Sequence, residues 1–486
     1  MRTVSGAVAL ALMITSAVHA DSAAIANFDA TLENIRAEHE LPALGGIAIL
    51  DGEVKAIGAV GLRKFEGKEA VTPEDKWHIG SCTKSMTATL AATFVEEGKL
   101  RWDSTIGDVL GRKVKMRDEY KDVTLKMLVS NRSGIPGSPP LATRIRIAQN
   151  TGGRDIEKRR KQFAEDYLNQ KPEFEPGTQY AYSNGGFVVA GVMMETISGR
   201  SWEELMQERI FKPLEMKSAG FGGAASKRKE DQPWGHRPKN KPVPPGPRDD
   251  NPDVLGPAGT VHCSLSDLAR YARMHAEHEV GPVLKKVETF ELLQTIAEGN
   301  DSYACGWVVY DRPWAKGPAI THSGSNTMNF CTIWFAPKRK FVAIAVSNVD
   351  ERTGPAPCDA VVSYLMGSLL ADGAPAGAKA RKVSPFEALR WEKDQPVVKI
   401  GKQWFTLVSL DGIAAEEIVK FCKREHADRW QKRFGEDLVE VLEGMEHEPG
   451  AEVDLVVKAL GSSIEKKLAG VKMTEENRAA IKAAAE

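Results

Sequence analysis

Residues 77–88 constrain this chain more than any other stretch, because they place Ser81 and Lys84 at the start of a helix. Residues 83–97 are mostly small or apolar, and Gly98 follows as a natural helix end. Side chains three positions apart share one helix face, so Ser81 and Lys84 can touch. A lysine can deprotonate a serine hydroxyl only when burial or nearby positive charge holds it neutral. The spacing therefore predicts a nucleophilic serine with its base, or else an ordinary serine N-cap.

The surroundings of Ser81 separate it from two other Ser-x-x-Lys copies. Those copies lie in a charged loop at 226–229 and among alternating charges at 463–466, and we interpret both as chance. Ser81 instead follows Gly80 and precedes an apolar helix, whose N-terminal N–H groups can stabilise a developing oxyanion. Cys82 has no adjacent His to activate it, so we interpret it as a small core residue.

Length and charge exclude several classes of protein. The 486 residues, 42% of them hydrophobic, can build a large core and more than one domain. With 65 basic and 66 acidic residues, the net charge is -1, so no overall field favours nucleic acid or an anionic membrane. Residues 1–20 resemble a signal peptide, with Arg2, a short apolar run and small residues at its end. We expect an exported protein, periplasmic or secreted, without a membrane span.

A stretch rich in Ala, Gly, Lys and Pro, residues 371–384, predicts a linker. Residues 21–370 then form the domain that carries the chemistry. Hairpin, helix and strand patterns follow in 385–486 and predict a small α+β domain of unknown role. The six cysteines are scattered without a Cys-x-x-Cys pair, so no metal is expected, and their pairing stays open.

A second informative segment, residues 175–186, contains Tyr182 and Asn184. Pro-Gly and Gly-Gly bracket it and predict a tight loop before an apolar helix. Both side chains can project into a cleft where the backbone turns. Taken alone, the simpler interpretation is that Tyr182 packs and Asn184 caps a turn.

Three basic features of the sequence are not assigned to a functional site. The run 158–161 is expected to be a solvated helix face. His236, within the Lys-, Arg- and Pro-rich residues 225–252, is expected to lie in an exposed loop. His262 is interpreted as a turn residue.

A meander of strands is predicted at 303–310, 319–322, 330–335 and 341–347. His322 and Gly324 lie between the second and third of these strands. A glycine after a strand permits close approach of a ligand. The backbone N–H of Ser325 can then supply a second oxyanion donor.

The three motifs Ser81-x-x-Lys84, Tyr182-x-Asn184 and His322-x-Gly324 occur in a fixed order, each with its own neighbourhood. Together they resemble the serine β-lactamase and penicillin-binding superfamily. The resemblance favours the branch of class C β-lactamases, DD-peptidases, D-aminopeptidases and family VIII esterases, and covers roughly residues 25–370. Matching segments also occur at 128–137, 176–186, 257–259, 306–307 and 347–348.

The resemblance implies an α+β fold, in which an antiparallel sheet is flanked by helices and a mostly helical lobe adjoins it across the site. It implies that Ser81 attacks a carbonyl, while Lys84 and Tyr182 share general base and acid work. Asn184 would orient Lys84 and hydrogen-bond the substrate amide.

The third motif carries the implied substrate contacts. His322 stands where the family usually has a lysine, and near neutral pH it is only partly charged. This combination resembles DD-peptidases and D-aminopeptidases more than class C β-lactamases. Ser323 replaces a threonine without loss of an implied role. The N–H groups of Ser81 and Ser325, beside Gly324, would form the oxyanion hole.

We therefore expect a serine hydrolase that forms an acyl-enzyme on Ser81, acting first on peptides as a DD-peptidase or D-aminopeptidase. A carboxylesterase or weak β-lactamase of the same fold is the alternative. A non-catalytic binding or scaffold protein is the alternative of another class. The expected partner is a small peptide, ester or β-lactam-like molecule, with no cofactor, no metal and no nucleic acid. The sequence indicates no partner for residues 385–486.

Overall fold

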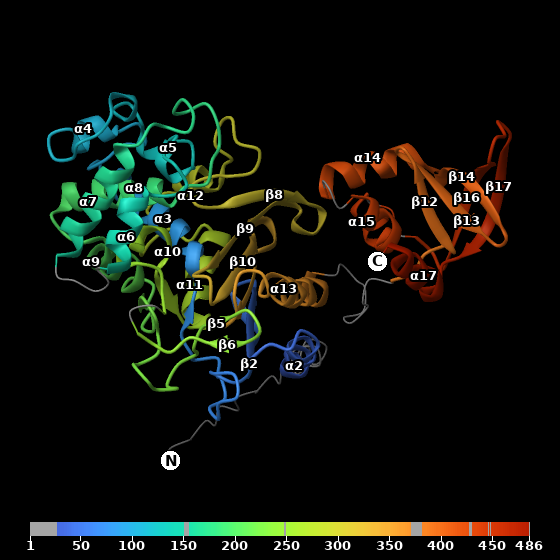
Figure 1. Cartoon of the computed structure of the whole chain (residues 1–486), viewed down its shortest axis with the longest axis horizontal. Coiled ribbons are helices and arrows are strands. Elements are labelled where there is room, and N and C mark those ends of the chain that lie inside the picture. The colour runs from blue at the N-terminus through green and yellow to red at the C-terminus, as the bar shows by residue number, and fades with distance from the viewer. Residues whose placement is uncertain are drawn as a thin grey trace, which may run out of the picture. The chain divides into compact units, whose positions relative to one another are not determined.

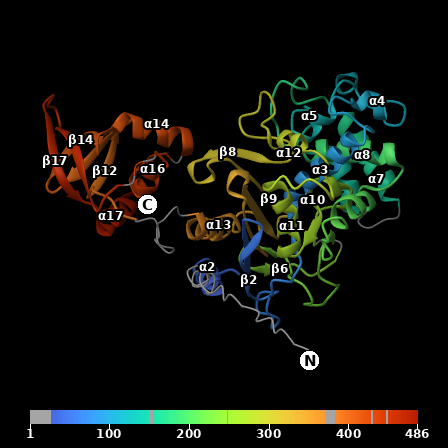
Figure 2. The same cartoon turned by 180° about the vertical axis from the view of Figure 1, so that it is seen from behind.

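The computed structural model describes residues 27–149, 155–246, 249–370, 382–426, 430–445, 447 and 449–485 (Figures 1 and 2). The predicted leader and residues 371–381 of the predicted linker lie outside them. The chain divides into two compact units, one ending at Ala371 and one running from Asp372 to Glu486. Within the described residues, no helix combines the length and apolar character needed to cross a membrane.

The first unit is built on a six-stranded antiparallel sheet. In spatial order its strands are β2 (Glu53–Gly61), β1 (Ala43–Leu50), β11 (Phe341–Ser347), β10 (Phe330–Ala336), β9 (Gly317–Ser325) and β8 (Val308–Arg312). Asp51 and Gly52 join β1 to β2 with φ values of 50° and 79°, as a two-residue hairpin turn requires. The predicted meander is present, but its first strand begins only at Val308.

Helices cover both faces of this sheet (Figure 1). Successive residues of β11 point to opposite faces of the sheet. Ile344 packs in the hydrophobic cluster that includes α11 (Leu265–Ala276), whereas its neighbour Ala343 packs in a second cluster on the other face. The second cluster includes α2 (Phe28–Glu38) and α13 (Pro355–Leu370). The central strands are therefore apolar along their whole length.

A helical lobe adjoins the sheet, with α3 (Thr83–Glu96) at its centre. Helix α3 is buried on nearly all sides and ends before Gly98, whose φ of 69° suits the residue after a helix. Around it pack α5 (Leu125–Val129), α8 (Asn184–Ser198), α9 (Trp202–Met206) and α10 (Gly256–Gly259), and α7 (Ile156–Leu168) packs against α8. The antiparallel sheet flanked by helices, with its helical lobe, confirms the predicted α+β fold.

The expectation of a solvated basic face on α7 holds for Lys158, which is exposed, but is wrong for Arg160. Arg160 is fully buried and pairs with Glu195 of α8 and Glu203 of α9. Two inward carboxylates offset the cost of burying one guanidinium, which a local charge pattern cannot reveal. Arg159 also pairs with Asp253, at 2.6 Å.

Both histidines interpreted as loop or turn residues are buried. His236 accepts from the backbone N–H of Phe65 at 2.9 Å, and its Nδ1 lies 2.7 Å from the carbonyl of Asn348. Burial lowers the pKa of His236 to about 4. His262 lies in strand β7 (Val261–Cys263) and pairs with His78 of β3 (Trp77–His78). Partners far away in sequence therefore decide the environment of both rings.

The second unit is a small α+β domain. Its sheet has the order β12 (Ala388–Glu392), β13 (Gln395–Ile400), β14 (Gln403–Leu410), β16 (Glu452–Ala459) and β17 (Glu465–Lys472), with β15 (Ile413–Ala414) paired to β14. Its helices are α14 (Ala415–His426), α15 (Trp430–Glu436), α16 (Leu438–Gly444) and α17 (Glu475–Ala485). Asp437, the N-cap of α16, separates it from α15.

Candidate active site

Ser81 lies in a short 3₁₀ turn, Gly80–Cys82, which we call the nucleophile turn. The turn links β3 to α3, so Ser81 stands just before the helix and not inside its first turn. Cys82 is fully buried, and its thiol donates to the carbonyl of His322 at 3.3 Å. That bond fixes the nucleophile turn against strand β9. All six cysteines are buried and unpaired.

Lys84 is fully buried, with its Nζ between three oxygens. It donates to Oδ1 of Asn184 and to the carbonyl of Ala258, each at 2.7 Å, and lies 3.0 Å from Oγ of Ser81. The Asn184 and Ala258 oxygens can only accept hydrogen bonds. A neutral Lys84 amine therefore donates its two N–H groups to them and directs its lone pair at Ser81 Oγ. Burial lowers the pKa of Lys84 to about 7, so much of it is neutral at neutral pH.

Tyr182 approaches Ser81 from the other side. Its hydroxyl donates to Oγ of Ser81 at 2.7 Å. The residue is 40% exposed, yet its hydroxyl end is enclosed, and that desolvation raises the pKa of Tyr182 well above its usual range. Tyr182 therefore stays protonated and donates its hydrogen bond to Ser81.

Asn184 is the first residue of α8. Ser183 is the N-cap, and its hydroxyl accepts from the N–H of Gly186 at 3.3 Å. The capping role considered for Asn184 thus falls to Ser183, and the Asn184 amide is directed at Lys84. Asn131 fixes this segment, because its Oδ1 accepts from the Ser183 N–H at 3.1 Å.

Two glycines let the nucleophile turn contact the end of β9. A Cβ on Gly80 would collide with the backbone nitrogen of Ser325. A Cβ on Gly324 would collide with the carbonyl of Ile79 and lie 2.5 Å from the backbone nitrogen of Ser81. Both predicted oxyanion donors therefore belong to segments in direct contact, and only glycine fits at either position.

The ring of His322 is buried and both of its nitrogens have partners. It is 4% exposed, with Nδ1 2.7 Å from the carbonyl of Ser323 and Nε2 3.2 Å from the hydroxyl of Tyr303. Tyr303 is 3% exposed and packs against Tyr180, with ring centres 5.5 Å apart. The ring of His322 is thus buried, as is the side chain of Lys84.

Direct hydrogen bonds therefore join Ser81, Lys84, Tyr182 and Asn184, and backbone contact adds Gly324 and Ser325. Ala258 was not predicted, because it acts through its backbone carbonyl. Asn131 was not predicted, because its partner Ser183 lies 52 positions away. Tyr303 was also missed, since it looked like the start of a strand.

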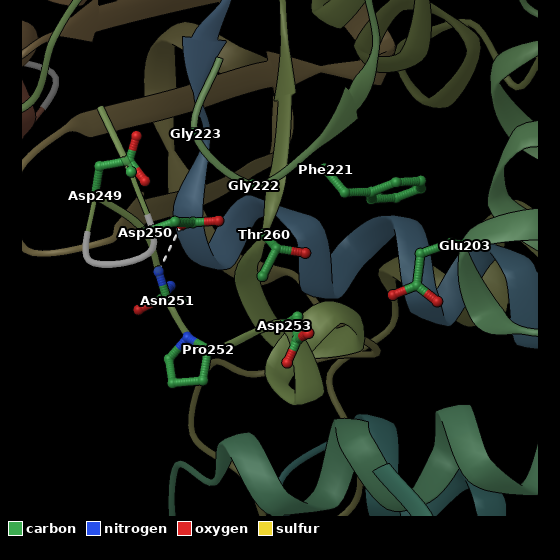
Figure 3. A pocket seen from close by; sticks show the side chains of 11 residues that line it. Glu203, Phe221, Gly222, Gly223, Asp249, Asp250, Asn251, Pro252, Asp253 and Thr260 are labelled. Carbon is green, nitrogen blue, oxygen red and sulfur yellow. Dashed lines mark hydrogen bonds between the residues drawn. The ribbon is translucent and has the colours of Figure 1, made fainter. Parts of the chain in front are cut away.

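A pocket of about 270 Å³ opens beside this site (Figure 3). Four acidic residues line it, Glu203, Asp249, Asp250 and Asp253. Asn251, one of its lining residues, connects the pocket to the site, because its Nδ2 donates at 2.8 Å to the carbonyl of Gly259, the residue after Ala258. Among the described residues, no three acidic, His or Cys side chains are grouped to hold a metal ion.

The fold and this arrangement of side chains define the serine β-lactamase and penicillin-binding-protein class. The Beta-lactamase family model matches residues 28–362, so the chain belongs to that family. It is 28% identical over 344 residues to penicillin-binding protein 4 of Amycolatopsis lactamdurans, covering 66% of this chain and 85% of that protein. It is 21% identical over 330 residues to the protein flp of Staphylococcus aureus, of which it spans 64%.

Solved structures share the fold at low identity. The octameric penicillin-binding protein homologue from Pyrococcus abyssi aligns with a TM-score of 0.59 and 22% identity, covering 91% of this chain and 90% of its own. The D-stereospecific amidohydrolase from Streptomyces aligns with a TM-score of 0.55 and 22% identity, covering 70% and 97%. The family match lies within the first unit, whereas the Pyrococcus alignment extends into the second.

Proposed function

We propose that the protein is a serine hydrolase that forms an acyl-enzyme on Ser81. The environment of Lys84 carries this proposal, since it holds a desolvated amine with its lone pair toward Ser81 Oγ. Burying a lysine costs free energy, and a purely structural position is better served by an apolar side chain. This cost argues against a non-catalytic scaffold.

The reaction follows from the donors and acceptors in place. Neutral Lys84 takes the Ser81 hydroxyl proton as Oγ attacks a carbonyl, and the backbone N–H groups of Ser81 and Ser325 stabilise the oxyanion. When the carbonyl reforms, the leaving nitrogen or oxygen departs with that proton, delivered through Tyr182. Water then attacks the ester on Ser81 and gives its proton to Lys84, which returns the proton to Ser81 Oγ as the acyl C–Oγ bond breaks and the acid leaves.

Peptides with D-residues are the first substrate class that we propose. The relatives include a penicillin-binding protein and a D-stereospecific amidohydrolase, and both names point to that chemistry. A DD-peptidase or D-aminopeptidase therefore ranks above a carboxylesterase or a weak β-lactamase. We also propose export, on the basis of the signal-like residues 1–20. An N-terminus at Asp21 in exported material would support it, and full-length material in the cytoplasm would refute it.

Intact mass after brief incubation with benzylpenicillin tests the nucleophile. The wild type should gain one penicilloyl group, and Ser81→Ala should gain none while melting at the same temperature. Ser81 contributes one small, partly exposed hydroxyl, so the substitution leaves packing intact.

The substrate class is tested separately with p-nitroanilides of D- and L-alanine and with p-nitrophenyl acetate. Preference for the D-anilide supports the peptidase, and turnover of the ester alone moves the assignment to an esterase. Full activity of Ser81→Ala on every substrate would refute the acyl-enzyme.

A further inference from the structure

The approach to the nucleophile turn contains a second ordered histidine. His78, in β3, is 4% exposed, and its Nδ1 accepts from the backbone N–H of Gly80 at 3.1 Å. Because Nδ1 accepts, the proton of the neutral ring is on Nε2, which lies 2.5 Å from Oδ1 of Asp250. Asp250 thereby orients the ring that holds Gly80.

The conformation of Gly80 sets the direction of the Ser81 N–H. Gly80 has a φ of 50°, and the peptide that follows it carries this donor. With its own N–H tied to His78, Gly80 cannot rotate without breaking that bond. Loss of the bond therefore tilts the first oxyanion donor away from its position.

Asp250 also contacts the segment that carries the second oxyanion donor, the N–H of Ser325. Its Oδ1 lies 3.4 Å from Nδ2 of Asn326, the residue directly after Ser325. Asn326 is 2% exposed, and its Oδ1 accepts from the N–H groups of Met328 and Asn329 at 3.2 and 2.9 Å. This side chain therefore fixes the turn that ends β9, next to the second donor.

The Asp250 carboxylate is itself held in place. Its side chain is only 9% exposed, and Oδ1 accepts from the N–H of Asn251 at 2.6 Å (Figure 3). Asp249 and Asp253 lie on the same loop, but Asp253 pairs instead with Arg159. One oxygen of Asp250 thus joins the two segments that bring the oxyanion donors together.

We propose that Asp250 is a positioning residue for the oxyanion hole, acting through His78 on the Ser81 N–H and through Asn326 on the Ser325 N–H. The inference rests on the proposed function, because it presumes that these donors serve an acyl transfer. The negative charge on the carbonyl oxygen develops mainly in the transition state, so misplaced donors slow turnover and leave substrate binding nearly intact.

The test is steady-state hydrolysis of p-nitrophenyl acetate by Asp250→Ala, with active sites counted by penicillin labelling. We expect kcat per active site to fall roughly 10- to 100-fold with KM nearly unchanged, somewhat less than for outright loss of one donor. Asp250→Asn keeps an acceptor oxygen for His78 and should recover most of the rate. Affinity for phenylboronic acid, a tetrahedral transition-state analogue, should fall by the same factor as kcat/KM.

Asp253→Asn is the matched control, because it removes a carboxylate from the same loop and pocket without touching His78 or Asn326. It should keep the wild-type kcat. Thermal melting separates lost folding from lost positioning. An active wild type with full kcat in Asp250→Ala overturns the inference alone. A wild type that neither turns over ester nor acquires penicillin removes the proposed function and the inference together.

Discussion

The environment of Lys84 predicts how fast Ser81 is acylated at each pH. In a folded chain the amine has a pKa of about 7, because burial disfavours the ammonium form. The pKa is lowered, so the reactive neutral form is present above pH 7 and lost below it. Tyr182 cannot replace it, since burial raises its pKa and keeps the phenol protonated.

The size of the effect follows from the neutral fraction of Lys84. With a pKa of about 7, about half of the amine is neutral at pH 7 and about 1% at pH 5. If proton transfer to Lys84 limits acylation, the rate falls roughly 50-fold over that interval and flattens above pH 8. A base with an unshifted lysine pKa would instead give a rate that still rises tenfold per unit at pH 8.

Single-turnover labelling by benzylpenicillin, followed by intact mass between pH 5 and 9, measures this profile. The carboxylate of the reagent stays ionised throughout that range, so its charge does not vary. Tyr182→Phe should lower the whole curve without moving its midpoint. A flat profile, or a midpoint that moves with Tyr182→Phe, would refute Lys84 as the base.

Two further substitutions test contacts of the first unit. Gly324→Ala places a methyl against the carbonyl of Ile79, so penicillin labelling should fall at least tenfold with an unchanged far-UV spectrum; wild-type labelling would contradict the close contact. Arg160→Met leaves Glu195 and Glu203 without their shared partner, and urea unfolding should show a loss of about 3–5 kcal/mol. An unfolding free energy equal to that of the wild type at neutral pH would mean that this ion cluster does not stabilise the fold.

Local spacing was sufficient to predict that Ser81 and Lys84 touch. They sit three positions apart at the start of one helix, so their contact follows from helix geometry. The sheet was predictable for the same reason, since strand alternation and hairpin turns are local. Tyr182 needed the family resemblance, because it lies 101 positions from its partner Ser81 and the two meet only in the fold.

Groups that act through the backbone or through distant partners were not predictable. The carbonyl of Ala258 accepts from Lys84, and no side chain marks it in the sequence. His236 and Arg160 looked solvated because their partners lie in other elements. Asp250 lay in a polar loop, and only the folded chain brings it to His78. Burial by tertiary contact, which a local charge pattern does not encode, explains each of these misses.

The buried ring of His322 bears on the choice among substrates. Within the proposed mechanism, a fixed cation at this strand position would attract a free carboxylate on the leaving side. Here Nδ1 faces the carbonyl of Ser323, which can only accept, and Nε2 faces Tyr303. The exposed side chain at this edge is the neutral hydroxyl of Ser323, 3.0 Å from that of Thr332. A leaving group without a terminal carboxylate therefore loses little binding here, which favours a D-aminopeptidase over a DD-carboxypeptidase within the proposed substrate class.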